Sequence, residues 1–206
     1  MQKLCLVLLA FIFIGQGCNS SNQRENSSFD NLSNDAHSYA NFNEARTTHL
    51  NLDLTVDFEQ KVLSGKATWD IDKTKKAKEL ILDIGNLKIK EITLDSNIAT
   101  QYTIGPVDSI KGQALTISLK PNTTSVTIHY STSPQAKALQ WLTPAQTLGK
   151  VHPFLFSQSQ AILARTWVPC QDAPGVKFTY EATIKTDSNL LALMSAENDT
   201  VLSPNG

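Results

Sequence analysis

Apolar and polar side chains alternate with a period of two residues between Thr47 and Ile71. Since successive side chains of a β-strand point to opposite faces, this pattern predicts strands with one buried and one solvent-facing side. The segment Glu59-Gln60-Lys61 interrupts the alternation and is expected to turn the chain, so the sequence predicts a long β-hairpin. Its buried face is expected to consist of Thr48, Leu50, Leu52, Leu54, Val56 and Phe58 on the first strand and Leu63, Gly65, Ala67, Trp69 and Ile71 on the second.

The same alternation recurs further along the chain. Strands are expected at 80–84, 87–94, 115–119, 126–130, 176–184 and 190–194. The apolar positions slip by one residue at Lys90-Glu91, which predicts a β-bulge there. The strands 115–119 and 126–130 are expected to pair around Pro121-Asn122. No long amphipathic helix pattern is found after residue 34, so the predicted fold class is all-β, with a twisted antiparallel or mixed sheet.

The first 34 residues have a different character. A short positive start precedes the apolar run 4–14, which is too short to span a bilayer but has the length of a signal-peptide core. Gly15-Gln16-Gly17-Cys18 then resembles a bacterial lipoprotein signal, whose cleavage would leave Cys18 as the acylated first residue. Gly15 departs from that pattern, where a branched apolar residue is usual, so plain secretion and a retained anchor remain alternatives.

These features predict a division of the chain into three parts. Residues 1–17 are expected to be a lipoprotein signal peptide, and residues 18–34, rich in Asn and Ser, a solvated tether. Residues 35–206 are expected to form one β domain. The expected location is the bacterial cell envelope, with the domain held to a membrane through lipidated Cys18.

Charge and motifs exclude several kinds of function. With 18 basic and 19 acidic side chains, the formal net charge is -1, so the chain lacks the basic excess that phosphate binding requires and we expect no nucleic-acid partner. No GxSxG, GxGxxG or phosphate-binding glycine loop is present. The four histidines show no metal-binding spacing, and His49 and His129 fall on the polar phase of their strands, where they are expected to face solvent.

Of the three cysteines, only Cys170 is expected to remain as a thiol. Cys5 would leave with the signal peptide and Cys18 would be acylated. Cys170 is either a small buried apolar residue or a nucleophile. No His or cationic residue adjoins it to depress its pKa, which favours the first interpretation.

The stretch 138–172 breaks the alternation. Within it, the buried-looking strand Phe154-Leu155-Phe156 leads into Ser157-Gln158-Ser159-Gln160-Ala161. Uncharged amides after an apolar strand suit a site that hydrogen-bonds a polar ligand. Alternatively, these glutamines satisfy backbone groups at the edge of a sheet.

Several ordered segments carry a resemblance that covers residues 35 to 206. They are His37-Ser38-Tyr39-Ala40, the run 44–50, the run 139–144, the run 152–158, Pro169-Cys170-Gln171-Asp172 and the run 176–180. Together they resemble the amino-terminal domain of M1 zinc aminopeptidases of the leukotriene A4 hydrolase-like branch. The resemblance implies a saddle-shaped β domain that packs on a thermolysin-like catalytic domain of the same polypeptide and closes one end of the substrate channel. The family's zinc motif HExxH and its GxMEN loop are absent from the sequence, so zinc would be held outside this chain.

The resemblance also implies roles for individual residues. Gln160, in a QxQA strand, would help hold the α-ammonium group of a peptide substrate with a free amino terminus. Ala161 would line the first substrate pocket, and Gln158 would support Gln160. Arg165-Thr166-Trp167 and the turn 169–172 are interpreted as structural, with Asp172 accepting backbone N–H groups.

The carboxyl end favours a longer parent protein. Val201-Leu202 is expected to begin a strand that runs into Asn205-Gly206, a turn signal that calls for a partner strand on its far side. We therefore expect the chain to be an inactive fragment of an aminopeptidase. A stand-alone β-sandwich binding lipoprotein and a surface adhesion or scaffolding domain are the alternatives, and an in-frame HExxH downstream would distinguish the first hypothesis from these.

Overall fold

A computed structural model of the protein describes residues 35–198. The predicted signal peptide, tether and Cys18, and the carboxyl-terminal turn, lie outside these residues. The described part contains eleven strands and two short 3-10 helices, and none of its helices is long and apolar enough to cross a membrane. The elements are β1 (Ala45–Asp57), β2 (Val62–Lys73), β3 (Glu79–Ile84), β4 (Lys88–Leu94), β5 (Ile98–Ala99), β6 (Tyr102–Ile104), β7 (Gln113–Ser118), β8 (Ser125–Ser131), β9 (Leu139–Leu142), η1 (Pro144–Gln146), β10 (Phe154–Ser157), η2 (Ala164–Thr166) and β11 (Thr179–Lys185).

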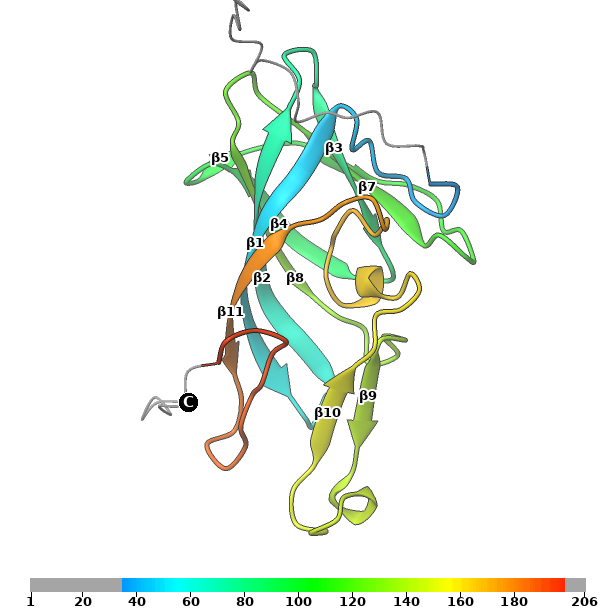
Figure 1. Ribbon diagram of the computed structural model, residues 1–206, viewed down its shortest axis with the longest axis vertical. Helices are drawn as coiled ribbons and strands as arrows, with labels where there is room; N and C mark the ends of the chain where they lie inside the picture. The colour runs from blue at the N-terminus through cyan, green and yellow to red at the C-terminus, as the bar shows by residue number, and fades with distance from the viewer. Residues whose placement is uncertain (1–34, 199–206) are drawn as a thin grey trace, which may run out of the picture.

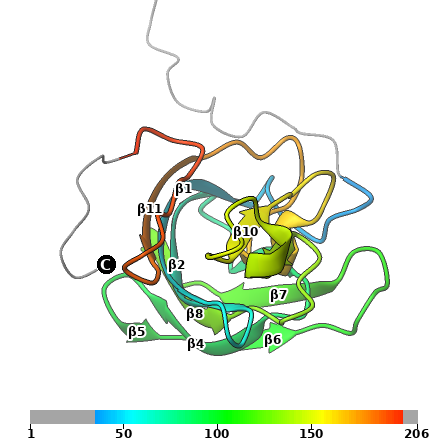
Figure 2. The ribbon, with the colours of Figure 1, turned by 90° about the horizontal axis from the view of Figure 1, so that it is seen from below.

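Six strands form the main sheet, in the order β11-β1-β2-β8-β4-β5 (Figure 1). The pair β11–β1 is parallel and the others are antiparallel, so the predicted all-β class is confirmed and the sheet is mixed. Seen along the long axis, the sheet curves, and β10 lies on its inner side (Figure 2). The predicted hairpin 47–71 is confirmed as β1 and β2, and the predicted bulge as a register shift between Ile89 and Glu91.

A second sheet has the order β3-β7-β6, and β9 and β10 form a separate hairpin. The predicted pairing of 115–119 with 126–130 is wrong, because β7 belongs to the second sheet and β8 lies between β2 and β4 in the first. Alternation shows that a strand has a buried face, but it does not identify the neighbouring strand.

One continuous core joins the two sheets. Leu52, Trp69 and Ile128 of the main sheet and Leu80 and Leu115 of the second belong to the same buried cluster. Trp69 is fully buried, and its indole N–H donates to the carbonyl of Pro169 at 2.8 Å. The segment around Pro169 is therefore part of the core.

Two sequence predictions near the ends of the domain are corrected. A register shift between Thr47 and His49 changes the phase of β1, so Thr47 is fully buried and Thr48 only half-buried, the reverse of the prediction. The predicted strand 190–194 is absent, since these residues form no ladder. They instead line an apolar groove, which accounts for their alternating partial burial.

Candidate functional site

The predicted site residues lie on a loop that leaves β10. The ladder between β9 and β10 ends with Ser157, and one more bond, from the Gln158 N–H to the Ala138 carbonyl at 2.8 Å, extends it. Gln160 and Ala161 then form a turn. The prediction that the QxQA motif lies on a strand is therefore wrong beyond Ser157, because β10 ends there and the chain turns toward η2.

Local hydrogen bonds define the conformation of this loop. The Gln158 Oε1 atom accepts from the Gln160 backbone N–H at 3.0 Å, and the Leu163 N–H donates to the Ser159 carbonyl at 2.9 Å. The peptide bond between Gln160 and Ala161 is cis. Gln158 thus bonds the backbone of Gln160 directly, which is compatible with the supporting role that the resemblance implies for it.

Gln158 and Gln160 differ in how their side-chain amides are used. Gln158, Gln160 and Ala161 are all exposed. Within residues 35–198, the side-chain amide of Gln160 forms no hydrogen bond, whereas that of Gln158 is used within the loop. The alternative interpretation, in which glutamines satisfy backbone groups, therefore applies to Gln158 and not to Gln160.

Trp167 contacts this loop at Ser159. Its indole Nε1 atom donates to the Ser159 hydroxyl at 3.1 Å, and this contact is partly buried. Trp167 also packs against the main core and caps η2, where its backbone N–H donates to the Ala164 carbonyl. The sequence predicts no contact between Ser159 and Trp167, because no local pattern links the two positions.

Behind the loop, Arg165 anchors η2 through a buried network. Its side chain is 2% exposed, and its Nε atom donates to Asp172 Oδ2 at 2.9 Å. Its Nη1 atom donates to the carbonyls of His37 and Lys111 at 2.9 and 2.6 Å, and its backbone carbonyl accepts from the Gly85 N–H. These contacts confirm the structural interpretation of Arg165 and Asp172.

Asp83 completes this network from β3. Its carboxylate accepts from the Ser38 hydroxyl, the Tyr39 N–H and the Asp172 N–H at 2.5, 2.8 and 3.1 Å. Burial raises the pKa of Asp83, and these hydrogen bonds and the nearby Arg165 charge oppose that rise. Sequence reasoning misses Asp83, since an acidic residue between apolar ones in a strand looks solvent-facing.

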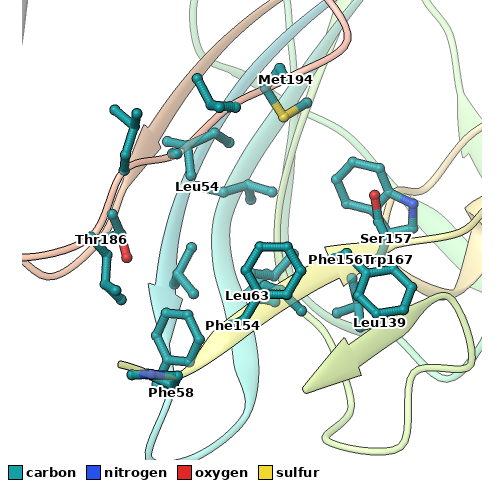
Figure 3. Close-up of a pocket in the computed structure, with 18 of the residues that line it drawn as sticks. Leu54, Phe58, Leu63, Leu139, Phe154, Phe156, Ser157, Trp167, Thr186 and Met194 are labelled. Carbon is teal, nitrogen blue, oxygen red and sulfur yellow. The ribbon is translucent and has the colours of Figure 1, made fainter. Parts of the chain in front are cut away.

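An apolar groove of about 430 Å³ lies next to the loop. Figure 3 shows Phe58 at one end of the groove and Trp167 with Ser157 at the other, with β10 between them. Phe154 and Phe156 are 52% and 44% exposed, so the expected burial of this run is wrong. In the described part of the chain, β10 pairs only with β9. The groove is lined by Leu54, Val56, Phe58, Leu63, Leu139, residues 153–157, Trp167, Ile184, Thr186 and residues 190–195.

Within residues 35–198, the histidines and Cys170 do not gather into a metal site. No three His, Cys, Asp or Glu side chains of this described part are grouped so that they could hold a metal. His49 bonds the Thr179 hydroxyl through Nδ1 at 2.7 Å. Cys170 is a free, buried thiol whose pKa is raised by burial, which confirms that it is a small core residue.

Residues 46–205 match the Peptidase M1 N-terminal domain family. The chain is 39% identical over 175 residues to leukotriene A-4 hydrolase of Xenopus laevis, covering 82% of this chain and 29% of that protein. It is 38% identical over 172 residues to leucine aminopeptidase 2 of Yarrowia lipolytica, covering 81% of this chain and 26% of that protein. The chain belongs to the peptidase M1 N-terminal domain family.

One solved structure agrees with this assignment, and a more distant one shares the fold. Yeast LTA4 hydrolase, solved in complex with bestatin, superposes with a TM-score of 0.71 at 32% identity, covering 77% of this chain and 25% of that chain. An M1 zinc metallopeptidase from Deinococcus radiodurans shares the fold with a TM-score of 0.54 at 17% identity, covering 69% of this chain and 32% of that chain. The chain thus spans between about a quarter and a third of the length of these proteins.

Proposed function

We propose that this chain is the domain of an M1 zinc aminopeptidase that lines the substrate channel and binds the free amino terminus of a peptide. The proposal rests on the family membership and on one observation of the site. Gln160 presents an exposed side-chain amide that is not engaged by residues 35–198, on a loop whose Gln158, Gln160 and Leu163 backbone N–H groups are hydrogen-bonded.

The chemistry of an amide suits this task. The Gln160 Oε1 atom can accept a hydrogen bond from an α-ammonium group without placing a full negative charge beside it. Ala161 comes next on the same exposed turn, where its methyl group would contact the first side chain of the peptide. Gln158 keeps the turn in place through its bond to the Gln160 N–H.

Residues 35–198 do not provide the zinc site of such an enzyme, because no suitable ligand group comes together in them. In this proposal the metal and the bond-breaking groups belong to a metallopeptidase part joined to this chain. The chain alone is therefore expected to be inactive. Its own contribution is to bind and orient the amino terminus, and no step that it performs passes through zinc.

The proposal is tested by substituting Gln160 in the polypeptide that joins this chain to its metallopeptidase part. Gln160→Ala should raise KM for aminoacyl reporters, with a loss of about 1–3 kcal/mol in transition-state binding. Gln160→Glu keeps an acceptor and should preserve binding. The matched control is Gln140→Ala on β9, an exposed glutamine whose amide bonds the Lys137 carbonyl. A kcat/KM for Gln160→Ala within twofold of the unsubstituted protein would refute the role of Gln160.

A membrane anchor is a separate proposal. It rests on the apolar run 4–14 and on Cys18, and it places the domain in the cell envelope of a bacterium. The polar tether 18–34 would allow the domain to lie at a distance from the lipid surface. The test is mass spectrometry of the mature protein expressed in a bacterium: the anchored form begins at Cys18 and carries acyl chains. Cys18→Ala should abolish both acylation and partition into detergent, and an unacylated mature chain would exclude the anchor.

The stand-alone binding lipoprotein is the second candidate function, and the apolar groove is the observation that favours it. The gene sequence downstream of Gly206 distinguishes the two candidates. An in-frame HExxH with a downstream Glu supports the aminopeptidase proposal, whereas its absence supports the binding protein.

A further inference from the structure

Gln160 can bind a substrate group productively only if its turn is held in one place. The turn is exposed, and the hydrogen bonds that hold it include three made by the Gln158 N–H, the Leu163 N–H and the Ser159 hydroxyl. The first two are backbone bonds that most residue types at these positions would make. The third depends on two particular side chains.

We propose that Trp167 is a positioning residue for Gln160, acting through the hydrogen bond from its indole N–H to the Ser159 hydroxyl. This inference rests on the proposed role of Gln160 and adds to it the residue that fixes the loop. Ser159 lies directly before Gln160, so a displacement of Ser159 moves the peptide that carries the Gln160 side chain.

Trp167 is suited to this role because its own position is firmly fixed. It lies two residues after Arg165, and the buried bonds of Arg165 to Asp172, His37 and Lys111 anchor that turn of η2. The ring packs on the core and forms one end of the groove beside Ser157 (Figure 3). A rigid two-ring side chain thus connects the buried network to the exposed loop.

The first arm of the test measures hydrogen exchange in the 206-residue chain. Trp167→Phe keeps an apolar ring but removes the donor, and Ser159→Ala removes the acceptor. Both variants should speed exchange of the Gln158, Gln160 and Leu163 amides by about three- to tenfold, the range expected for one net hydrogen bond. Ser159→Thr retains a hydroxyl and should restore slow exchange.

Trp141→Phe is the matched control. Trp141 lies on β9, and its buried Nε1 atom has no hydrogen-bond partner in the described part of the chain. The same substitution there removes an N–H without breaking a bond, and loop exchange should not change. Unchanged exchange in Trp167→Phe and Ser159→Ala, with native circular dichroism, would overturn the inference.

The second arm measures kinetics in the polypeptide that includes the metallopeptidase part. Trp167→Phe and Ser159→Ala should each raise KM about three- to tenfold with kcat within twofold. Adding Trp167→Phe to Gln160→Ala should cause no further rise, because Trp167 acts through Gln160. If Gln160→Ala raises KM and Trp167→Phe raises the KM of that variant further by its own full factor, only the positioning role is overturned. If Gln160→Ala itself has no effect, the proposed function fails, and with it the role of Trp167.

Discussion

Asp172 accepts three hydrogen bonds from Arg165: its Oδ2 atom accepts from the Nε atom at 2.9 Å and from the backbone N–H at 3.2 Å, and its backbone carbonyl accepts from the Nη2 atom at 3.0 Å. The pair brings the two ends of the segment 165–172 together against β3, where the Asp83 backbone exchanges hydrogen bonds with Cys170. This arrangement connects the core of the domain to the loop that carries Gln160.

Removing the Arg165 side chain should destabilise the domain strongly. Arg165→Ala leaves the carboxylates of Asp83 and Asp172 without their buried cation, and we expect the free energy of unfolding to fall by about 3–5 kcal/mol. Urea denaturation of the 206-residue chain followed by circular dichroism measures this. The control is Lys185→Ala, which breaks a 3.5 Å ion pair with Asp53 between half-exposed side chains and should cost no more than about 1 kcal/mol. Similar losses in both variants would contradict the prediction.

Asp83 should make stability depend on pH. Burial raises its pKa above the ordinary 3.8, so the folded chain binds this proton more tightly than the unfolded chain. The stabilising contribution of Asp83 is therefore complete below the unfolded pKa and is lost as pH rises through the folded pKa. Relative to Asp83→Asn, the unsubstituted chain should lose stability as the pH rises above the ordinary carboxyl pKa of 3.8. Urea midpoints at a series of pH values test this, and a difference that is constant or grows with pH would contradict it.

Asp95 should show the opposite trend. Its slight burial raises the pKa, but bonds from the Thr124 and Ser125 backbone N–H groups and the Thr124 hydroxyl outweigh this and hold the pKa below 3.8. The contribution of Asp95 to the free energy of unfolding is present above its pKa in the unfolded chain, and it disappears as the pH falls through its pKa in the folded chain. Asp95→Asn should thus lower the urea midpoint near neutral pH and lose its effect in strong acid. An effect that increased on acidification would be inconsistent with this.

Gly65 should not tolerate a side chain. A Cβ atom at this position would lie 2.0 Å from the Asp53 carbonyl oxygen of the neighbouring strand, and the backbone φ is +155°. Gly65→Ala should therefore lower the free energy of unfolding by at least about 2 kcal/mol. Gly149→Ala is the matched control, because no atom lies within 4 Å of a Cβ there, and it should change stability by less than about 0.5 kcal/mol.

The thiol of Cys170 should be unreactive in the folded domain. It is 4% exposed, and burial raises its pKa, so little thiolate forms and reagents cannot reach it. In a chain with Cys5→Ser and Cys18→Ser, a disulfide reagent at mildly alkaline pH should label Cys170 only after urea unfolding. Rapid labelling of the native chain would show that the core opens readily around this residue.

The local alternation of the sequence is sufficient to predict most strands. The hairpin 47–71, the bulge near Lys90 and the burial of Cys170 can be predicted from side-chain period and composition, because these depend on neighbours in sequence. The amides after the strand 154–156 leave a polar-ligand site open as one interpretation, and the resemblance selects Gln160, whose exposed, unengaged amide is consistent with that role.

Tertiary structure decided which strands pair and which polar residues are buried. Strands β7 and β8 are consecutive in the chain but lie in different sheets, and β11 adds in parallel to β1, more than a hundred residues away. Asp83 and Arg165 are buried because partners from distant segments satisfy them, and Trp167 meets Ser159 because η2 folds back toward the loop. The period of the sequence shows which face of a strand is buried. These contacts instead depend on packing between distant segments, and no local sequence pattern reports such packing.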